Sequence, residues 1–257
     1  MNDVLIIIPT YNEIENIDKI IRSIFNLYTD VHILVVDDNS PDQTSSKVIE
    51  LQAIFKEQLH LQIRKSKSGL GPAYIHGFKW AVDKKYNFIF EMDADFSHDP
   101  KDIKSLYNKC NEGLADLCIG SRYKEGINVV NWPLGRIILS LFASYYVRLF
   151  TGMNIKDPTS GFVCYKRKVI EKINLDMVKF VGYAFQIEMK YKSYVNHFKL
   201  VEIPIVFKDR TYGQSKLNSS IIKEAVFGVI SMRIKSFFFL SISFNTNFFL
   251  IFFVHKQ

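Results

Sequence analysis

The chain carries the stretch FIFEMDADFSH at residues 88–98, in which an apolar run is followed at once by two aspartates, Asp93 and Asp95. Burying an unpaired carboxylate inside a strand costs several kcal/mol, so both side chains are expected where the strand ends. There they could converge on a divalent cation, because Mg²⁺ and Mn²⁺ prefer hard oxygen ligands and Mg²⁺ is usually held by one or two carboxylates together with phosphates. Two aspartates at this spacing are also typical of a plain turn, so the surrounding segments have to decide.

Those segments alternate between strand and helix patterns. Strands are expected over 4–8, 31–36, 60–63, 87–92 and 115–120, and helices over 13–27, 42–57, 69–84 and 100–110. This alternation predicts right-handed βαβ units and an α/β fold with a mostly parallel sheet flanked by helices. Ligands of such sheets bind outside the carboxyl ends of the strands, and three strand ends carry polar clusters, at 9–13, 37–38 and 93–95. The coincidence of three clusters predicts a binding site at that edge.

The composition narrows the class of partner. With 257 residues and 48% hydrophobic content the chain can build a substantial core and is not disordered. Its net charge of +7 suits nucleic acid, an anionic membrane surface or phosphate-bearing substrates. No basic run alternates with aromatic residues and no nucleic-acid motif occurs, so membrane surface and phosphates are favoured and nucleic acid is not expected.

Neither the cysteines nor the N-terminus indicates an exported protein. Cys110, Cys118 and Cys164 are odd in number and lack metal-binding spacing, which favours reduced thiols. The apolar run at 4–8 is too short for a signal peptide and ends at Pro9, so no secretory signal is expected.

The second half of the sequence is more apolar. Residues 137–150 are almost wholly apolar or aromatic and are flanked by Arg136 and Arg148. Such a segment is too short to span a bilayer, which takes about 20 residues, so a core helix and an interfacial helix both remain open. A second apolar run at 237–254 is interrupted by polar residues at 245–247, which favours surface association or a dimer contact over a clean span. The oligomeric state is left open.

Eight motifs in chain order resemble those of the family 2 glycosyltransferases, which have the GT-A fold. They are IPTYNE at 8–13, VDDNSPD at 36–42, GLGPAY at 69–74, MDADFSHDP at 92–100, GSRY at 120–123, DPTSGF at 157–162, GYAFQIE at 182–188 and RTYGQSK at 210–216. Within that family the chain is most similar to the dolichyl- or polyprenyl-phosphate mannosyltransferases. Pro72 departs from the family pattern, where a small polar residue is more usual.

The resemblance implies a catalytic domain at 1–230, with a donor half at about 1–123 and an acceptor half at about 124–230, followed by a hydrophobic tail at 231–257. It implies inverting transfer of mannose from GDP-mannose to a polyprenyl (dolichyl-type) phosphate, with Mg²⁺ or Mn²⁺ as cofactor, at the cytoplasmic face of a membrane.

The resemblance also implies roles for individual residues. Asp93 and Asp95 would hold the metal, and Asp95, Arg122 and Arg210 would support catalysis. The acceptor phosphate would be bound by Arg122, Arg136 and Ser140. Asp157 and Glu188 would orient loops or sugar hydroxyls. The nucleotide-sugar donor would contact Pro9, Tyr11, Glu13, Val36, Asp38, Asp93, Ala94, Asp95, Arg122, Arg210 and Lys216.

Two alternatives remain open. A related enzyme of the same fold could move glucose or N-acetylglucosamine from a UDP-sugar to undecaprenyl phosphate. A non-catalytic nucleotide-binding α/β module is also possible. A Rossmann-type oxidoreductase is disfavoured because no Gly-x-Gly-x-x-Gly follows the first strand.

Overall fold

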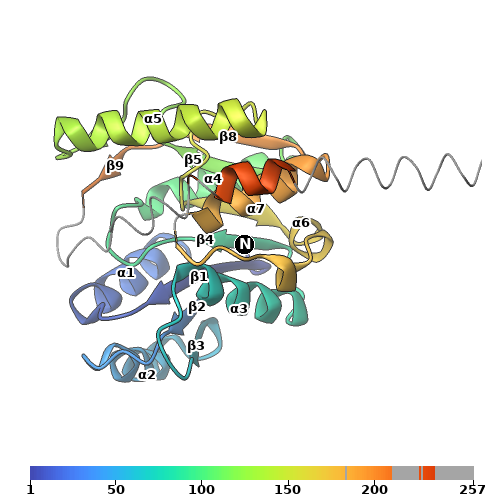
Figure 1. The fold of residues 1–257 in the computed structure, drawn as a ribbon. Helices are drawn as coiled ribbons and strands as arrows, with labels where there is room; N and C mark the ends of the chain where they lie inside the picture. Colours follow the sequence, from blue (N-terminus) through green and yellow to red (C-terminus); the bar gives the residue numbers. More distant parts are fainter. Residues whose placement is uncertain (183, 210–225, 227, 235–257) are drawn as a thin grey trace, which may run out of the picture.

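The computed structural model describes residues 1–182, 184–209, 226 and 228–234 (Figure 1). Within these residues seven strands form one sheet in the order β3-β2-β1-β4-β7-β5-β8. The strands are β1 Val4–Thr10, β2 His32–Asp37, β3 Leu59–Ile63, β4 Phe88–Glu91, β5 Leu117–Ser121, β7 Val163–Lys166 and β8 Leu200–Pro204. β7 is antiparallel to β4 and to β5, and the other neighbouring pairs are parallel. The mostly parallel α/β sheet predicted from the sequence is therefore confirmed.

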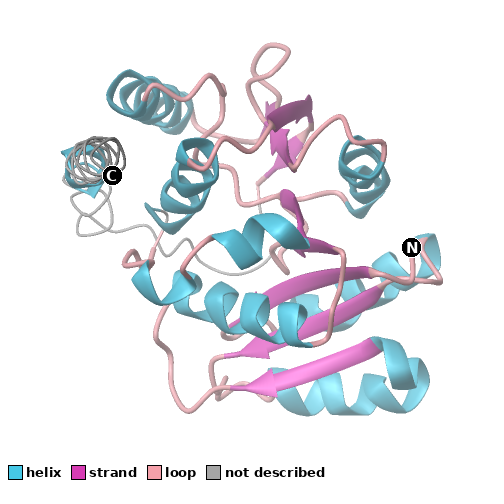
Figure 2. Ribbon diagram, turned by 90° about the vertical axis from the view of Figure 1, so that its right-hand side faces the viewer, coloured by secondary structure: helices cyan, strands magenta, loops and turns pink. Residues whose placement is uncertain are grey.

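Helices cover both faces of this sheet (Figure 2). One face packs against α1 Ile14–Leu27, α2 Thr44–Phe55 and α4 Ile103–Asn111, and the other against α3 Leu70–Asp83, α6 Arg167–Lys172 and α7 Ala184–Val195. Short 3₁₀ turns lie at Lys56–Gln58, Pro100–Asp102 and Leu175–Met177, and a small second sheet pairs β6 Val129–Val130 with β9 Phe207–Lys208. Because β1 and β2 carry apolar side chains toward both helical layers, their hydrophobic runs are nearly continuous.

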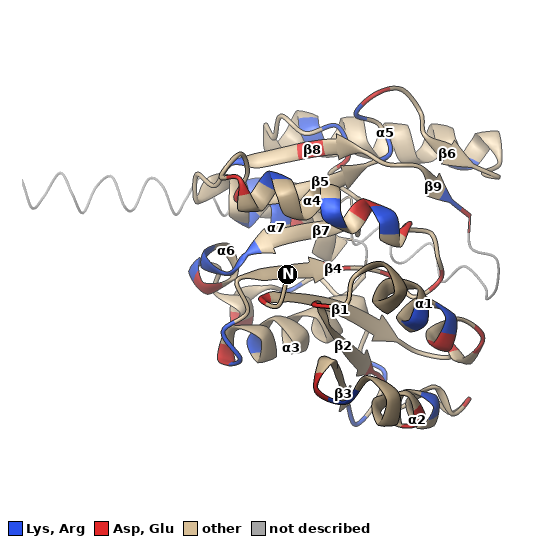
Figure 3. Cartoon of the chain, turned by 180° about the vertical axis from the view of Figure 1, so that it is seen from behind, with Lys and Arg blue, Asp and Glu red and all other residues tan. Residues whose placement is uncertain are grey.

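Helix α5, Leu134–Thr151, lies at the top of Figure 1 and exposes its apolar side. Leu134 and Phe142 are 71% and 67% exposed, whereas Ser144 and Thr151 are buried. The exposed residues recur at helical spacing and form one stripe, which we call the α5 stripe: Leu134, Ile138, Phe142, Tyr145 and Leu149. Most of α5 is uncharged in Figure 3. Of the two positions left open for residues 137–150, the structure therefore shows the surface position and not the core.

Among the described residues no helix has the length and hydropathy needed to cross a bilayer. The apolar run at 237–254 lies outside the described residues. β7 was not expected from the sequence, because a four-residue strand between two remote strands has no periodicity of its own.

Candidate functional site

The carboxyl ends of β1 and β2 are joined through Asp37. Thr10 donates from its hydroxyl to Asp37 at 2.7 Å, and Ser40 donates to the same carboxylate from its backbone N–H at 2.8 Å and its hydroxyl at 2.6 Å. Asp37 is fully buried. A buried carboxylate satisfied by three donors acts as the structural core of this turn. The neighbouring Asp38 is thereby placed at the rim of the sheet.

Asp38 and Glu13, both predicted to bind the donor, lie at this rim with partners that the sequence did not indicate. Asp38 accepts a hydrogen bond from the Ser68 N–H at 3.1 Å, and its carboxylate lies 3.3 Å from an Arg64 nitrogen. Glu13 precedes α1 and accepts from the Asn16 side chain at 2.9 Å. The loop before α3 therefore closes over the end of β2.

Tyr11, another predicted donor contact, is also at this rim. Tyr11 follows β1, and the Lys67 ammonium lies 4.2 Å from its ring centroid, a cation–π distance. Pro9 and Val36, also predicted donor contacts, are paired in register between β1 and β2. Lys67 was missed because only the folded loop brings it over Tyr11.

The two aspartates of residues 88–98 lie in the loop directly after β4. Asp95 is buried and accepts from the Ser97 N–H at 3.1 Å, while the Asp93 N–H donates to Nδ1 of His98 at 3.3 Å. Phe96 has a left-handed φ of 61°. Burial lowers the pKa of His98 to about 4, although Asp95 acts in the opposite direction. The imidazole is therefore neutral near pH 7 and can accept the Asp93 hydrogen bond.

The donor set fits a metal shared with a substrate but not one held by the protein alone. Among the described residues no group of three or more His, Cys, Asp or Glu side chains could hold an ion. Asp93 and Asp95 could supply the protein's share of the usual Mg²⁺ ligands, with phosphates completing the set.

Arg122, at the end of β5, is held by Asp157. Its Nε and Nη2 donate to the two Asp157 oxygens at 2.7 and 2.6 Å, and Nη2 also donates to the Thr159 hydroxyl at 2.6 Å. Burial would raise the pKa of Asp157, but the charge and hydrogen bonds of Arg122 outweigh it and hold that pKa below its ordinary value. Arg122 is only 8% exposed, so the cation predicted to bind phosphate is also half of a buried ion pair.

The residues predicted to bind the acceptor phosphate are linked to this pair through Tyr123 and Trp132, whose ring centroids lie 5.3 and 5.6 Å from the Arg122 guanidinium carbon. The Tyr123 hydroxyl donates to Ser140 on α5 at 2.7 Å. Arg136, one turn earlier on α5, donates to Asp209 at 2.8 Å and lies 4.0 Å from the Trp132 ring centroid. Arg122, Arg136 and Ser140 therefore belong to one contact network. The predicted Arg210 and Lys216 lie outside the described residues.

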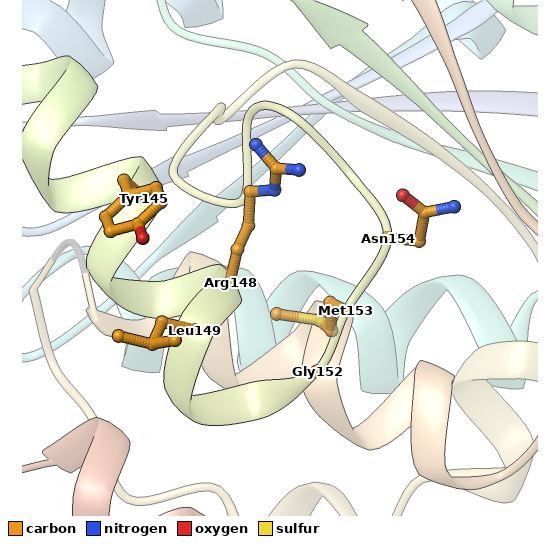
Figure 4. Close-up of a pocket in the computed structure, with 6 residues that line it drawn as sticks. All are labelled: Tyr145, Arg148, Leu149, Gly152, Met153 and Asn154. Carbon is orange, nitrogen blue, oxygen red and sulfur yellow. The ribbon is translucent and has the colours of Figure 1, made fainter.

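A separate pocket of about 270 Å³ lies at the other end of α5 (Figure 4). Its lining consists of Tyr145, Arg148, Leu149, Gly152, Met153 and Asn154. Arg148 and Arg136 are about 18 Å apart along the helix, at 1.5 Å per residue. A cation in the last turn also complements the helix dipole, which accounts for Arg148 without a ligand.

Comparison with known proteins identifies the class. The model of "Glycosyl transferase family 2" matches residues 5–174. The chain is 45% identical to polyprenol monophosphomannose synthase of Mycolicibacterium smegmatis, over 90% of this chain and 87% of the relative. It is 39% identical to undecaprenyl-phosphate mannosyltransferase of Micrococcus luteus, over 88% of this chain and 92% of the relative. The chain therefore belongs to glycosyl transferase family 2 and is a glycosyltransferase.

A solved structure agrees with this assignment at the level of the fold. Glucosyl-3-phosphoglycerate synthase from Mycobacterium tuberculosis, in complex with Mn²⁺ and UDP-glucose, superposes with a TM-score of 0.65 at 15% identity, covering 91% of this chain and 78% of that chain. The GT-A fold is thereby confirmed.

Proposed function

We propose that this enzyme transfers mannose from GDP-mannose to a polyprenyl phosphate at the cytoplasmic face of a membrane. Two relatives at 45% and 39% identity bear names that specify mannose and a polyprenol or polyprenyl phosphate. The observation that carries the proposal is α5, which combines the predicted phosphate contacts Arg136 and Ser140 with the exposed α5 stripe. A prenyl phosphate has the same two parts, an anionic head and an apolar chain.

The donor would occupy the carboxyl ends of β1, β2 and β4. Tyr11 offers a stacking face, and Glu13 and Asp38 offer acceptors for base N–H groups, with Pro9, Val36 and Ala94 shaping the walls. Asp93 and Asp95 would hold Mg²⁺ or Mn²⁺, which when bound stabilises the departing nucleoside diphosphate. Binding of Mn²⁺ and UDP-glucose in the solved structural neighbour is in line with a metal here.

The acceptor needs little activation by the protein. A phosphate monoester has a second pKa of about 6 and is largely dianionic near neutral pH, so its oxygen can attack C1 of the sugar without a general base. In-line attack inverts the anomeric centre. The barrier is the approach of two anions, and Arg122, Arg136 and Arg210 would lower it. A guanidinium has five N–H donors, so Arg136 can hold Asp209 and a phosphate together.

In this proposal residues 1–230 form the catalytic domain, with the donor half at about 1–123 and the acceptor half at about 124–230. Residues 231–257 add a hydrophobic tail. Lys216 and Arg210 would contact the donor diphosphate from the acceptor half.

The test is transfer from labelled GDP-mannose to a defined polyprenyl phosphate in detergent, with Mn²⁺ or Mg²⁺, against UDP-glucose and UDP-N-acetylglucosamine. The expected result is a metal-dependent, lipid-soluble mannosyl product that EDTA abolishes. Transfer from either UDP-sugar with no transfer from GDP-mannose would overturn the proposal and support the undecaprenyl-phosphate alternative.

A further inference from the structure

A charged group that the proposed reaction does not use lies beneath the site. Lys190 of α7 is fully buried, and its ammonium group donates to the Ser160 backbone carbonyl at 2.6 Å. It also donates to the Gln186 backbone carbonyl and side-chain oxygen, each at 3.2 Å. A lysine with no exposed surface that makes three short contacts is held in one place.

A second buried titratable group comes from the sheet, and burial raises its pKa to about 7, although the charge of Lys190 acts in the opposite direction. Glu91, the last residue of β4, is also fully buried, and neither of its oxygens has a hydrogen-bond partner. Tyr165 and Gln186 bring polar groups near Glu91 without reaching good hydrogen-bond geometry. Burial lowers the pKa of Lys190 to about 8, although the negative charges of Glu91 and Asp157 act in the opposite direction.

A contribution to stability does not by itself explain why Lys190 and Glu91 are both buried. Replacing a buried ion pair by apolar residues of similar volume is often neutral or stabilising. The layer on this face of the sheet is apolar and includes the buried residues Tyr74, Phe185 and Ile187. The reason for burying these two groups is therefore to be found in the segment that Lys190 contacts.

Lys190 contacts the loop at 157–161, which reaches both charged parts of the site. At one end of the loop Asp157 holds Arg122. In the middle, the Ser160 hydroxyl donates to the Gly120 carbonyl at 2.6 Å. At the other end, a Cβ placed on Gly161 would lie 3.8 Å from the His98 ring and 4.0 Å from the Asp93 carboxylate.

We propose that Lys190 is a positioning residue whose ammonium group, bound to the Ser160 carbonyl, fixes the 157–161 loop so that Arg122 and Asp93 face one bound diphosphate. The inference rests on the proposed function, which supplies the diphosphate. Lys190 acts through Ser160 and Asp157 and touches no reacting atom. A small displacement of a substrate-positioning group lowers the rate of the chemical step without much loss of ground-state binding.

The test separates support of the fold from positioning. Lys190→Met leaves the buried Glu91 without the favourable charge of Lys190 and removes the hydrogen bond to Ser160, and we expect both a lower melting temperature and at least a tenfold lower kcat. The double variant Glu91→Leu/Lys190→Met removes both charges. We expect it to recover the melting temperature but to keep the tenfold loss of kcat, with the KM for GDP-mannose changed less than threefold.

Lys79→Met is the control, because Lys79 forms an ion pair with Asp176 on the surface. It should leave kcat and KM unchanged. If the first double variant does not fold, as judged by circular dichroism, Glu91→Gln/Lys190→Gln replaces it with the same two readouts. A folded double variant with the wild-type kcat would overturn the role of Lys190. Absence of mannose transfer by the wild-type enzyme would instead reject the proposed function.

Discussion

The two parts of the candidate site are built in different ways. We call the part at the ends of β1, β2 and β4 the motif side, and the part around β5, β7 and α7 the network side. At the ends of β1, β2 and β4, short turns such as Asp37 to Ser40 and Asp95 to Ser97 are combined with contacts between neighbouring segments, such as Thr10 to Asp37. Around β5, β7 and α7, the contacts join remote segments, as between Arg122 and Asp157. The first side therefore contains turns built on local contacts, such as the one around Asp95, whereas the second is a network in which one lost partner disturbs several others.

Breaking the network side should have the largest effect. Arg122→Met leaves the fully buried Asp157 carboxylate unpaired, and removing one partner of a buried pair costs about 3–5 kcal/mol. We expect a loss of that size in urea unfolding, together with loss of mannose transfer. Arg22→Met is the control, because Arg22 makes an exposed i,i+4 pair with Asp18. Equal unfolding free energies for the two variants would show that the Arg122–Asp157 pair does not hold the network.

The motif side should lose activity while keeping its fold. Asp95→Ala removes one proposed metal ligand and one hydrogen bond to Ser97. We expect kcat/KM to fall by about 10²–10³, the loss typical of a removed electrostatic stabiliser, and stability to fall by only about 1 kcal/mol. Asp99→Ala is matched to it, since Asp99 accepts from the Lys101 N–H at 3.0 Å in the same local pattern. Activity in Asp95→Ala equal to that in Asp99→Ala would exclude Asp95 from the site.

The contrast between local and long-range contacts also explains which features could be predicted from the sequence. Strand and helix positions in the first half follow from local hydrophobic periodicity, and the polar strand ends follow from motifs. The partners Arg64 and Lys67 could not be predicted, because the loop that carries them has no periodicity and meets β1 and β2 only in the fold. The same holds for the Arg122–Asp157 pair and for Lys190, whose position on α7 is indistinguishable in sequence from a solvated lysine.

His98 lies between the two sides, because it accepts from the Asp93 N–H and stacks on Phe162. Its protonation in acid should lower the stability of the fold. The folded pKa of His98 is about 4, below the ordinary 6.5, so the unfolded chain binds more protons between these values. Stability from the neutral imidazole is therefore complete above about pH 6.5 and is lost as the pH falls to about 4, by about 3 kcal/mol in all. His98→Gln, which can still accept from Asp93, should flatten the pH dependence of unfolding over this range. Parallel curves for wild type and variant would contradict the burial of a neutral His98.

The smallest effect on folding is expected at α5, whose stripe contacts neither side of the sheet. Phe142→Ser/Leu149→Ser changes exposed residues, so stability should shift by less than about 0.5 kcal/mol. Binding to vesicles of phosphatidylcholine and phosphatidylglycerol, measured by co-sedimentation, should fall at least tenfold, because each buried large apolar side chain contributes about 1.5–3 kcal/mol.

Ile54→Ser is the control for this variant, since Ile54 on α2 is as exposed as the stripe but lies outside it. It should sediment with vesicles like the wild type. Activity assays sharpen the distinction. If the stripe only docks on the membrane, the double variant should transfer mannose to a short, water-soluble prenyl phosphate as well as the wild type does. Its transfer should then be lower only for an acceptor embedded in vesicles. Equal losses with both acceptors would mean that the stripe binds the prenyl chain directly, whereas equal sedimentation of the two variants would remove the membrane from the role of α5.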